Sequence, residues 1–118
     1  MKQDIKKLLR GVISENYVDA IYGYKIMKYE DGYAVSMGDS RFSFKPEIGK
    51  VYGTDRNGIY MSPNKEYVMD YYSGHNDVDI LLKFKFDKDN ILFGNLSDVE
   101  PEIGVRKAEL VDFEIIEH

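Results

Sequence analysis

Residues 80–86, with the sequence ILLKFKF, most limit how this 118-residue chain can fold. In this segment Ile80, Leu82, Phe84 and Phe86 alternate with Leu81, Lys83 and Lys85. Side chains of a β-strand point alternately to its two faces, so a period of two predicts a strand with one apolar face. That face needs a second apolar layer, and 43% of the residues are hydrophobic. We therefore expect one modest core organised around this strand.

Further short strands are predicted on both sides of this segment. β-Rich stretches occur between residues 20 and 62, separated by the turn signals EDG and GDS. ILFGN, after residue 90, predicts another short strand. Residues 103–116 predict one long strand, in which the apolar parity switches between Leu110 and Val111. This switch predicts a β-bulge or bend at that point.

Two segments have helical periodicity instead. Residues 3–16 carry apolar side chains at helical spacing, at Ile5, Leu8, Leu9, Val12 and Ile13. Such a helix packs on its own sheet or docks on a partner protein, and the sequence leaves both open. A second helix is predicted over about residues 63–72, because Ser62 is a good N-cap and Pro63 fits the first helical position. Gly74 suits the left-handed conformation that follows a helix.

These elements together predict an α+β fold. A mostly antiparallel sheet system would accompany an N-terminal amphipathic helix and one central helix. Residues 1–18 would hold the N-terminal helix, and residues 19–118 would form a single compact domain.

Charge and composition disfavour several classes of function. The net charge is −5 and no stretch of clustered lysine and arginine is present, which disfavours nucleic-acid binding. The chain has no cysteine, so disulfides, thiolate zinc sites and cysteine nucleophiles are absent. Its apolar runs are too short for a membrane span or a signal peptide. We expect a cytoplasmic protein, or a component of a particle assembled inside the cell.

Few motifs in the chain could carry metal or hydrolytic chemistry. His75, Asp77 and Asp79 could hold a divalent ion, but loops of this kind are usually solvated, so we expect no metal. No nucleophile elbow, H-E-x-x-H helix or P-loop occurs. Glu100 and Glu102 would share one face of an extended segment and could act as an acid–base pair. A solvated acidic loop is the plainer interpretation of this pair.

The predicted central helix is rich in tyrosine. Tyr67, Val68, Tyr71 and Tyr72 fall on one helical face, which could pack on the sheet or form the wall of a pocket. A helix that begins at Ser62 also offers free backbone N–H groups to an anion such as a phosphate.

Three short motifs, taken in order, resemble those of the ADP-ribosyltransferase family, which includes poly(ADP-ribose) polymerases and related toxins. GYKIM places Tyr24 and Lys25 where the family has an aromatic residue followed by histidine or arginine. GIYMS matches the family's second strand motif, and Tyr71 has the spacing of the tyrosine in the helix that follows. EIGV places Glu102 at the position of the catalytic glutamate. The chain is also similar to small uncharacterised domains of tailed phages.

The resemblance implies an ADP-ribosyltransferase-like fold and a transfer of ADP-ribose from NAD to a protein. Glu102 would be the catalytic residue, since a carboxylate stabilises an oxocarbenium-like ribose. The cofactor-binding residues would be Tyr24, Lys25, Tyr60, Ser62 and Tyr71, with Tyr71 and Tyr60 stacking on nicotinamide, Lys25 on the adenosine side and Ser62 donating at the rim. The alternative is a non-catalytic phage accessory, virion or host-protein-binding module, which would dock through the helix at residues 3–16.

Overall fold

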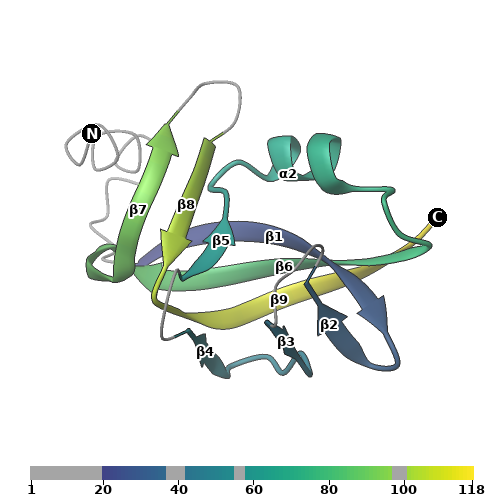
Figure 1. Ribbon diagram of the computed structural model, residues 1–118. Helices are drawn as coiled ribbons and strands as arrows, with labels where there is room; N and C mark the ends of the chain where they lie inside the picture. The colour runs from purple at the N-terminus through teal and green to yellow at the C-terminus, as the bar shows by residue number, and fades with distance from the viewer. Residues whose placement is uncertain (1–19, 37–41, 55–57, 97–100) are drawn as a thin grey trace.

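The computed structural model describes residues 20–36, 42–54, 58–96 and 101–118 of the chain (Figure 1). Its elements are β1 (Ala20–Glu30), β2 (Tyr33–Val35), β3 (Ser43–Phe44), β4 (Val51–Gly53), β5 (Ile59–Met61), α2 (Lys65–Tyr72), β6 (Val78–Asp87), the 3-10 helix η1 (Lys88–Asn90), β7 (Ile91–Leu96), β8 (Pro101–Val105) and β9 (Lys107–Glu117). The helix expected over residues 3–16 lies outside the described residues, as does the proposed boundary at residue 18.

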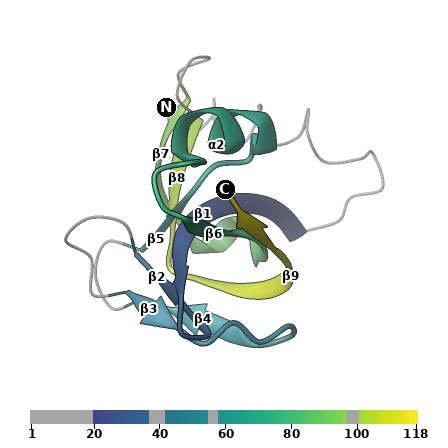
Figure 2. The ribbon, with the colours of Figure 1, turned by 90° about the vertical axis from the view of Figure 1, so that its right-hand side faces the viewer.

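The strands form two antiparallel sheets. Six strands make the larger sheet in the order β3-β2-β1-β6-β9-β4, and three make the smaller sheet in the order β5-β8-β7. The larger sheet is strongly curled, and α2 lies over its β1 and β6 strands (Figures 1 and 2). Residues of both sheets share the main core, which therefore lies inside the curl.

The predicted α+β class is wrong. Among the described residues, the only helical parts are the eight residues of α2 and the three residues of η1, while nine antiparallel strands make up the rest of the regular structure. The described part of the protein is therefore mostly β, a curled antiparallel sheet system with one short α-helix on it. The helix contributes little to the core because only Val68 is buried among its eight residues.

Strand β6 organises the core as its alternation predicts. Ile80, Leu82 and Phe84 are fully buried in the main core inside the curl. Leu81 points to the opposite face and packs with Val68 of α2 in a second, smaller apolar cluster. The strand is thus covered on both faces, by the curled sheets on one side and by α2 on the other.

The C-terminal segment shows both the expected bulge and an unexpected break. Lys83 pairs with Asp112 and Phe84 with Leu110, so Val111 is the extra residue of a β-bulge, which confirms the predicted parity switch. The single long strand predicted over residues 103–116 is wrong, however. The chain leaves the smaller sheet at Arg106 and enters the larger sheet as β9, so one apolar run supplies strands to both sheets.

The start of α2 also differs from the prediction. The helix begins at Lys65, and its N-cap is Asn64, whose side-chain oxygen accepts the N–H of Tyr67 at 3.0 Å. Asparagine caps a helix as well as serine does, so residue type alone could not decide between them. Gly74, with φ of +89°, adopts the left-handed conformation expected after the helix.

A short junction joins the two sheets. The N–H of Tyr24 donates to the carbonyl of Ser62 at 2.7 Å, and the N–H of Ser62 donates to the carbonyl of Tyr24 at 2.9 Å. Next to this pair Met61 lies directly on Gly23, where a Cβ atom would come within 2.4 Å of the methionine sulfur. The glycine therefore allows β5 to approach the backbone of β1 closely enough for the junction to form.

We expect Phe84→Ala to lower the free energy of unfolding by about 3 to 5 kcal/mol, because it opens a cavity in the fully buried core. The neighbouring variant Lys85→Ala, on an exposed side chain of the same strand, should change it by less than about 0.5 kcal/mol. Urea unfolding of both variants measures this difference. Equal effects of the two substitutions would contradict the assignment of the inner face of β6.

Candidate binding cleft

A cleft of about 440 Å³ opens beside the junction of the two sheets. Strand β1 pairs with Ser62 at Tyr24, and with β2 from Lys28 onward. Between these two points, over residues 25–27, neither Ser62 nor β2 pairs with this edge of β1. The cleft is lined by Tyr24, Lys25, Ile26, Ser36, Phe42, Gly58, Ile59, Tyr60, Met61, Ser62, Val68, Tyr72 and Glu102. Its volume is within the range of about 300 to 1,000 Å³ that is usual for small-molecule sites.

Lys25 brings an amine into this cleft from the middle of β1. Its Nζ atom donates a hydrogen bond of 3.0 Å to the backbone carbonyl of Tyr60 on β5. Burial lowers the pKa of Lys25 to about 8, and the negative charge of Glu102 opposes part of this lowering. Burial acts in this direction because it penalises the charged ammonium more than the neutral amine.

Glu102 and Tyr72 form the acidic side of the cleft. The hydroxyl of Tyr72, in the last turn of α2, donates a hydrogen bond of 2.5 Å to Oε1 of Glu102 on β8. Burial and this hydrogen bond raise the pKa of the Tyr72 hydroxyl far above its ordinary value. The tyrosine therefore stays protonated and holds the carboxylate in one orientation. A hydrogen bond to a charged acceptor of this kind is among the stronger ones in proteins.

Most of the candidate residues from the sequence come together here. Tyr24, Lys25, Tyr60, Ser62 and Glu102 all line the cleft, although the first and the last are far apart in the sequence. Ser62 lines the cleft, but it is buried and does not lie at the rim where its donor role was expected. The second carboxylate of the proposed acid–base pair, Glu100, lies outside the described residues.

Tyr71 lies elsewhere. Its side chain is 53% exposed and is not among the residues that line the cleft, whereas Tyr72 is. The helical spacing contained the signal for this difference. Tyr72 follows the buried Val68 by four residues, so it lies nearer the centre of the inward face than Tyr71 does. The family spacing favoured Tyr71, and the geometry of this short helix favours Tyr72.

An exposed aromatic pair lies at the rim of the cleft. The ring of Tyr60 is 44% exposed and meets the ring of Phe93 edge to face, with centroids 5.1 Å apart. Both residues face outward from the smaller sheet, away from the buried Ile59 and Met61. The pair offers a flat aromatic surface next to the polar groups of the cleft.

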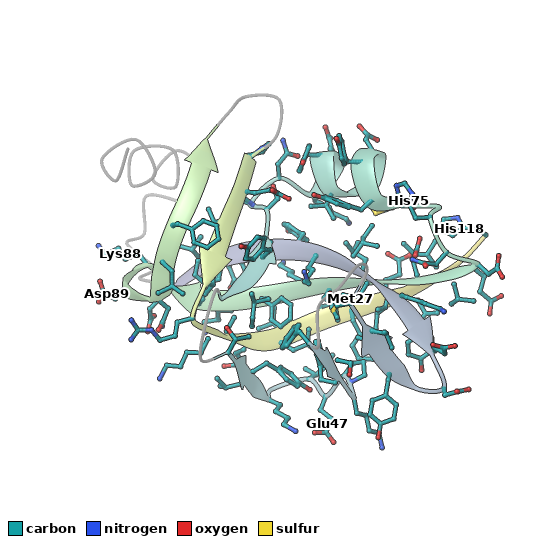
Figure 3. All side chains as sticks on the ribbon, in the orientation of Figure 1. Met27, Glu47, His75, Lys88, Asp89 and His118 are labelled. Carbon is teal, nitrogen blue, oxygen red and sulfur yellow. The ribbon has the colours of Figure 1, made fainter. Side chains whose placement is uncertain are left out.

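The loop after α2 uses its carboxylate for structure. Asp79 is fully buried and accepts hydrogen bonds from the N–H of Gly74 at 2.9 Å and from Nδ2 of Asn76 at 3.0 Å. His118 follows the end of β9 (Figure 3). Its Nε2 lies 2.7 Å from Oδ2 of the same carboxylate. His75 contacts the carbonyl of Tyr71 instead. Within the described ranges, no group of three or more His, Cys, Asp or Glu side chains could hold a metal ion.

No protein-family model matches the sequence, and no curated protein or solved structure matches the chain. In the part of the chain that the structure describes, no helix has both the length and the apolar character that crossing a membrane requires.

We expect Asp79→Asn to lower the free energy of unfolding at pH 7 by about 1 to 3 kcal/mol, because the new amide would face donors that now bind a carboxylate. Burial acts to raise the pKa of Asp79, but the three hydrogen bonds and the charge of His118 outweigh it and hold the pKa below 3.8. A lowered pKa stabilises the fold above the unfolded-state value, and this stabilisation is lost as the pH falls through the folded-state value.

The difference in the free energy of unfolding between wild type and Asp79→Asn should consequently become smaller once the pH drops below 3.8. Urea unfolding at a series of pH values measures it, with the exposed Asp77→Asn as the matched control. A difference that stays constant down to the lowest pH would contradict the ionised, hydrogen-bonded state of Asp79.

Proposed function

We propose that the cleft binds NAD and that the protein transfers ADP-ribose from it to a protein acceptor. The observation that carries the proposal is the convergence of Lys25, Tyr60, Ser62 and Glu102 on one cleft of suitable volume. A dinucleotide presents anionic phosphates, ribose hydroxyls and flat bases. The cleft offers a cation, a carboxylate and an exposed aromatic ring at its rim.

Glu102 is suited to the ribose beside nicotinamide. A carboxylate accepts hydrogen bonds from sugar hydroxyls and stabilises the positive charge that develops on the ribose as nicotinamide leaves. The bond from Tyr72 engages Oε1 and fixes the carboxyl group, which preorganises it for this role. Because the environment is partly buried, the charge of Glu102 acts more strongly than it would in water.

Lys25 and Tyr60 would serve the rest of the dinucleotide. The ammonium of Lys25 supplies a positive charge for a phosphate oxygen or a ribose hydroxyl. The ring of Tyr60, which is 44% exposed, can stack on a base. This assignment gives Tyr60 the main stacking role that the family spacing suggested for Tyr71.

The test compares wild type with Glu102→Gln, which keeps the size of the side chain and removes its charge. Addition of NAD should raise the melting temperature of both proteins. Wild type should release nicotinamide and label a protein of a cell lysate with ADP-ribose, whereas Glu102→Gln should do so at least about 100-fold more slowly.

Glu114→Gln, on an exposed side chain of β9, serves as the control and should match wild type. If NAD neither shifts the melting temperature of wild type nor is cleaved or transferred by it, the proposed function is wrong.

A second candidate function rests on the exposed aromatic pair. We propose, as the alternative, a non-catalytic module that binds a host or virion protein, since exposed aromatic rings are enriched at protein interfaces. The Tyr60–Phe93 pair on the smaller sheet would provide one contact, and the helix expected at residues 3–16 a second. The protein would then work in the cytoplasm of the host or in the phage particle, without nucleic acid as its partner.

Phe93→Ser distinguishes the two functions. As a protein-binding module, the variant should recover much less of its partner from a host lysate than wild type does, with the exposed Ile115→Ser as the matched control. As an NAD enzyme, it should retain nicotinamide release, because Phe93 does not line the cleft.

A further inference from the structure

The amine of Lys25 has an environment that the binding of a phosphate does not require. Its side chain leaves the inner face of β1, the face that also carries the buried Ile21 and Met27. At the end of this half-buried path Nζ reaches the carbonyl of Tyr60, and Lys25 is one of the residues that line the cleft. Of the described residues that line the cleft, only Lys25 carries an amine.

We propose that Lys25 is a covalent attachment site, where the amine condenses with the carbonyl group of a small hydroxylated aldehyde to form an imine. The neutral amine attacks the carbonyl carbon and forms the C–N bond. The carbonyl oxygen then leaves as water with the two hydrogens of the amine, so no oxidant or reductant is needed. The proposal does not depend on NAD and concerns a separate reaction of the same cleft.

The hydrogen bond of Lys25 orients the amine for this attack. A neutral amine keeps its N–H groups as donors, so the carbonyl of Tyr60 can hold one of them at 3.0 Å. The acceptor thereby turns the nitrogen lone pair away from itself. An ammonium has no lone pair to offer, so this arrangement becomes reactive only when the proton has left.

The groups around Lys25 support both steps of the condensation. Glu102 of β8 is a carboxylate in the same cleft and can carry a proton from the nitrogen to the departing oxygen. Tyr72 of α2 faces the same volume and holds Glu102 in place. On the other edge of β1, Lys25 pairs with the apolar Leu82, so no charged side chain opposes the amine from β6 at that position.

The lowered pKa of Lys25 favours the reaction at neutral pH. Its pKa of about 8, against 10.5 for an ordinary lysine, makes the neutral amine about 300-fold more populated at pH 7, since one pKa unit is a factor of ten. A less basic amine is also a weaker nucleophile, which offsets part of this gain. Lys25 should still react at least about ten-fold faster than an ordinary lysine at pH 7. Desolvated lysines are used in this way for Schiff-base chemistry.

The hydroxyl groups of the aldehyde match the other polar groups of the cleft. Glu102 can accept a hydrogen bond from a hydroxyl that lies one or two carbons from the carbonyl. The volume of about 440 Å³ accommodates a molecule of several carbons together with water. Aldehydes with a long apolar chain would bind more weakly, because the polar side chains of the cleft would lose hydrogen bonds to water and form none with the ligand.

Reductive trapping tests the proposal on the intact chain. The protein is treated with glyceraldehyde and cyanoborohydride at pH 7 for short times, and the modified lysines are mapped by mass spectrometry of peptides. Lys25 should be modified at least about ten-fold faster than the mean of Lys28, Lys85 and Lys107. Modification of Lys25 no faster than these lysines would overturn the proposal.

The same measurement at pH 10 provides a second arm. The neutral fraction should rise about ten-fold at a lysine with a pKa of about 8, but several-hundred-fold at one with a pKa of 10.5. The preference for Lys25 should therefore largely disappear. A preference that is as strong at pH 10 as at pH 7 would show that accessibility, and not a neutral amine, selects Lys25, and would also overturn the proposal.

Two variants complete the experiment. Lys25→Arg should abolish the fast modification, because a guanidinium stays charged, while Lys28→Arg should leave it intact. Because the mapping is resolved by site on wild type, the result stands even if Lys25→Arg folds poorly. Loss of NAD binding in a separate titration leaves this result unaffected, so failure of the proposed function and failure of this inference are distinguishable.

Discussion

Two backbone hydrogen bonds between Tyr24 and Ser62 hold the cleft together. One edge of β1 is fully used by β6, so the other edge decides how the smaller sheet and α2 attach to the larger sheet. Because Ser62 follows β5 and precedes α2, the same contact positions both elements. β8 then pairs with β5 and carries Glu102 to the cleft, while α2 carries Tyr72 to it. This contact therefore fixes where the groups of the site lie relative to β1.

The cleft is also the place where the chain departs from what stability alone would select. An amine on the inner face of a core strand costs free energy, since burial penalises its charge. The carbonyl of Tyr60 and the charge of Glu102 offset part of this cost. A methionine or leucine at position 25 would fill the same path without a polar group to satisfy. Local departures of this kind are expected at functional sites.

The sequence predicts the local structure well where one physical signal dominates. The alternation of residues 80–86 identifies the inner face of β6, and the parity switch identifies the bulge at Val111. Asp31 and Gly32, both with positive φ, form the turn predicted between β1 and β2. Each of these features is determined by neighbouring residues. The mostly antiparallel pairing follows from the same short, regularly spaced strands.

The features that the sequence does not predict depend on contacts between distant segments. The break at Arg106 exists because β8 and β9 find partners in different sheets, although their residues form one apolar run. By residue type Ser62 could cap the helix, but its backbone N–H and carbonyl both pair with Tyr24 on β1. The N-cap of α2 is Asn64 instead. The choice of Tyr72 over Tyr71 depends on the rotation of a two-turn helix. Of the candidate cofactor-binding and catalytic residues, the one on the helix, Tyr71, does not line the cleft.

The position of β6 between β1 and β9 has a consequence for synthesis on the ribosome. β6 emerges when only its β1 edge can be paired, because its second partner begins 20 residues after β6 ends, at Lys107. Until then the other edge of β6 is unpaired, and its apolar inner face lacks the cover of Ile103, Val105 and Leu110. An exposed apolar strand with a free edge is prone to pair with other chains. β8 and β9 therefore protect the nascent chain from aggregation as well as completing its core.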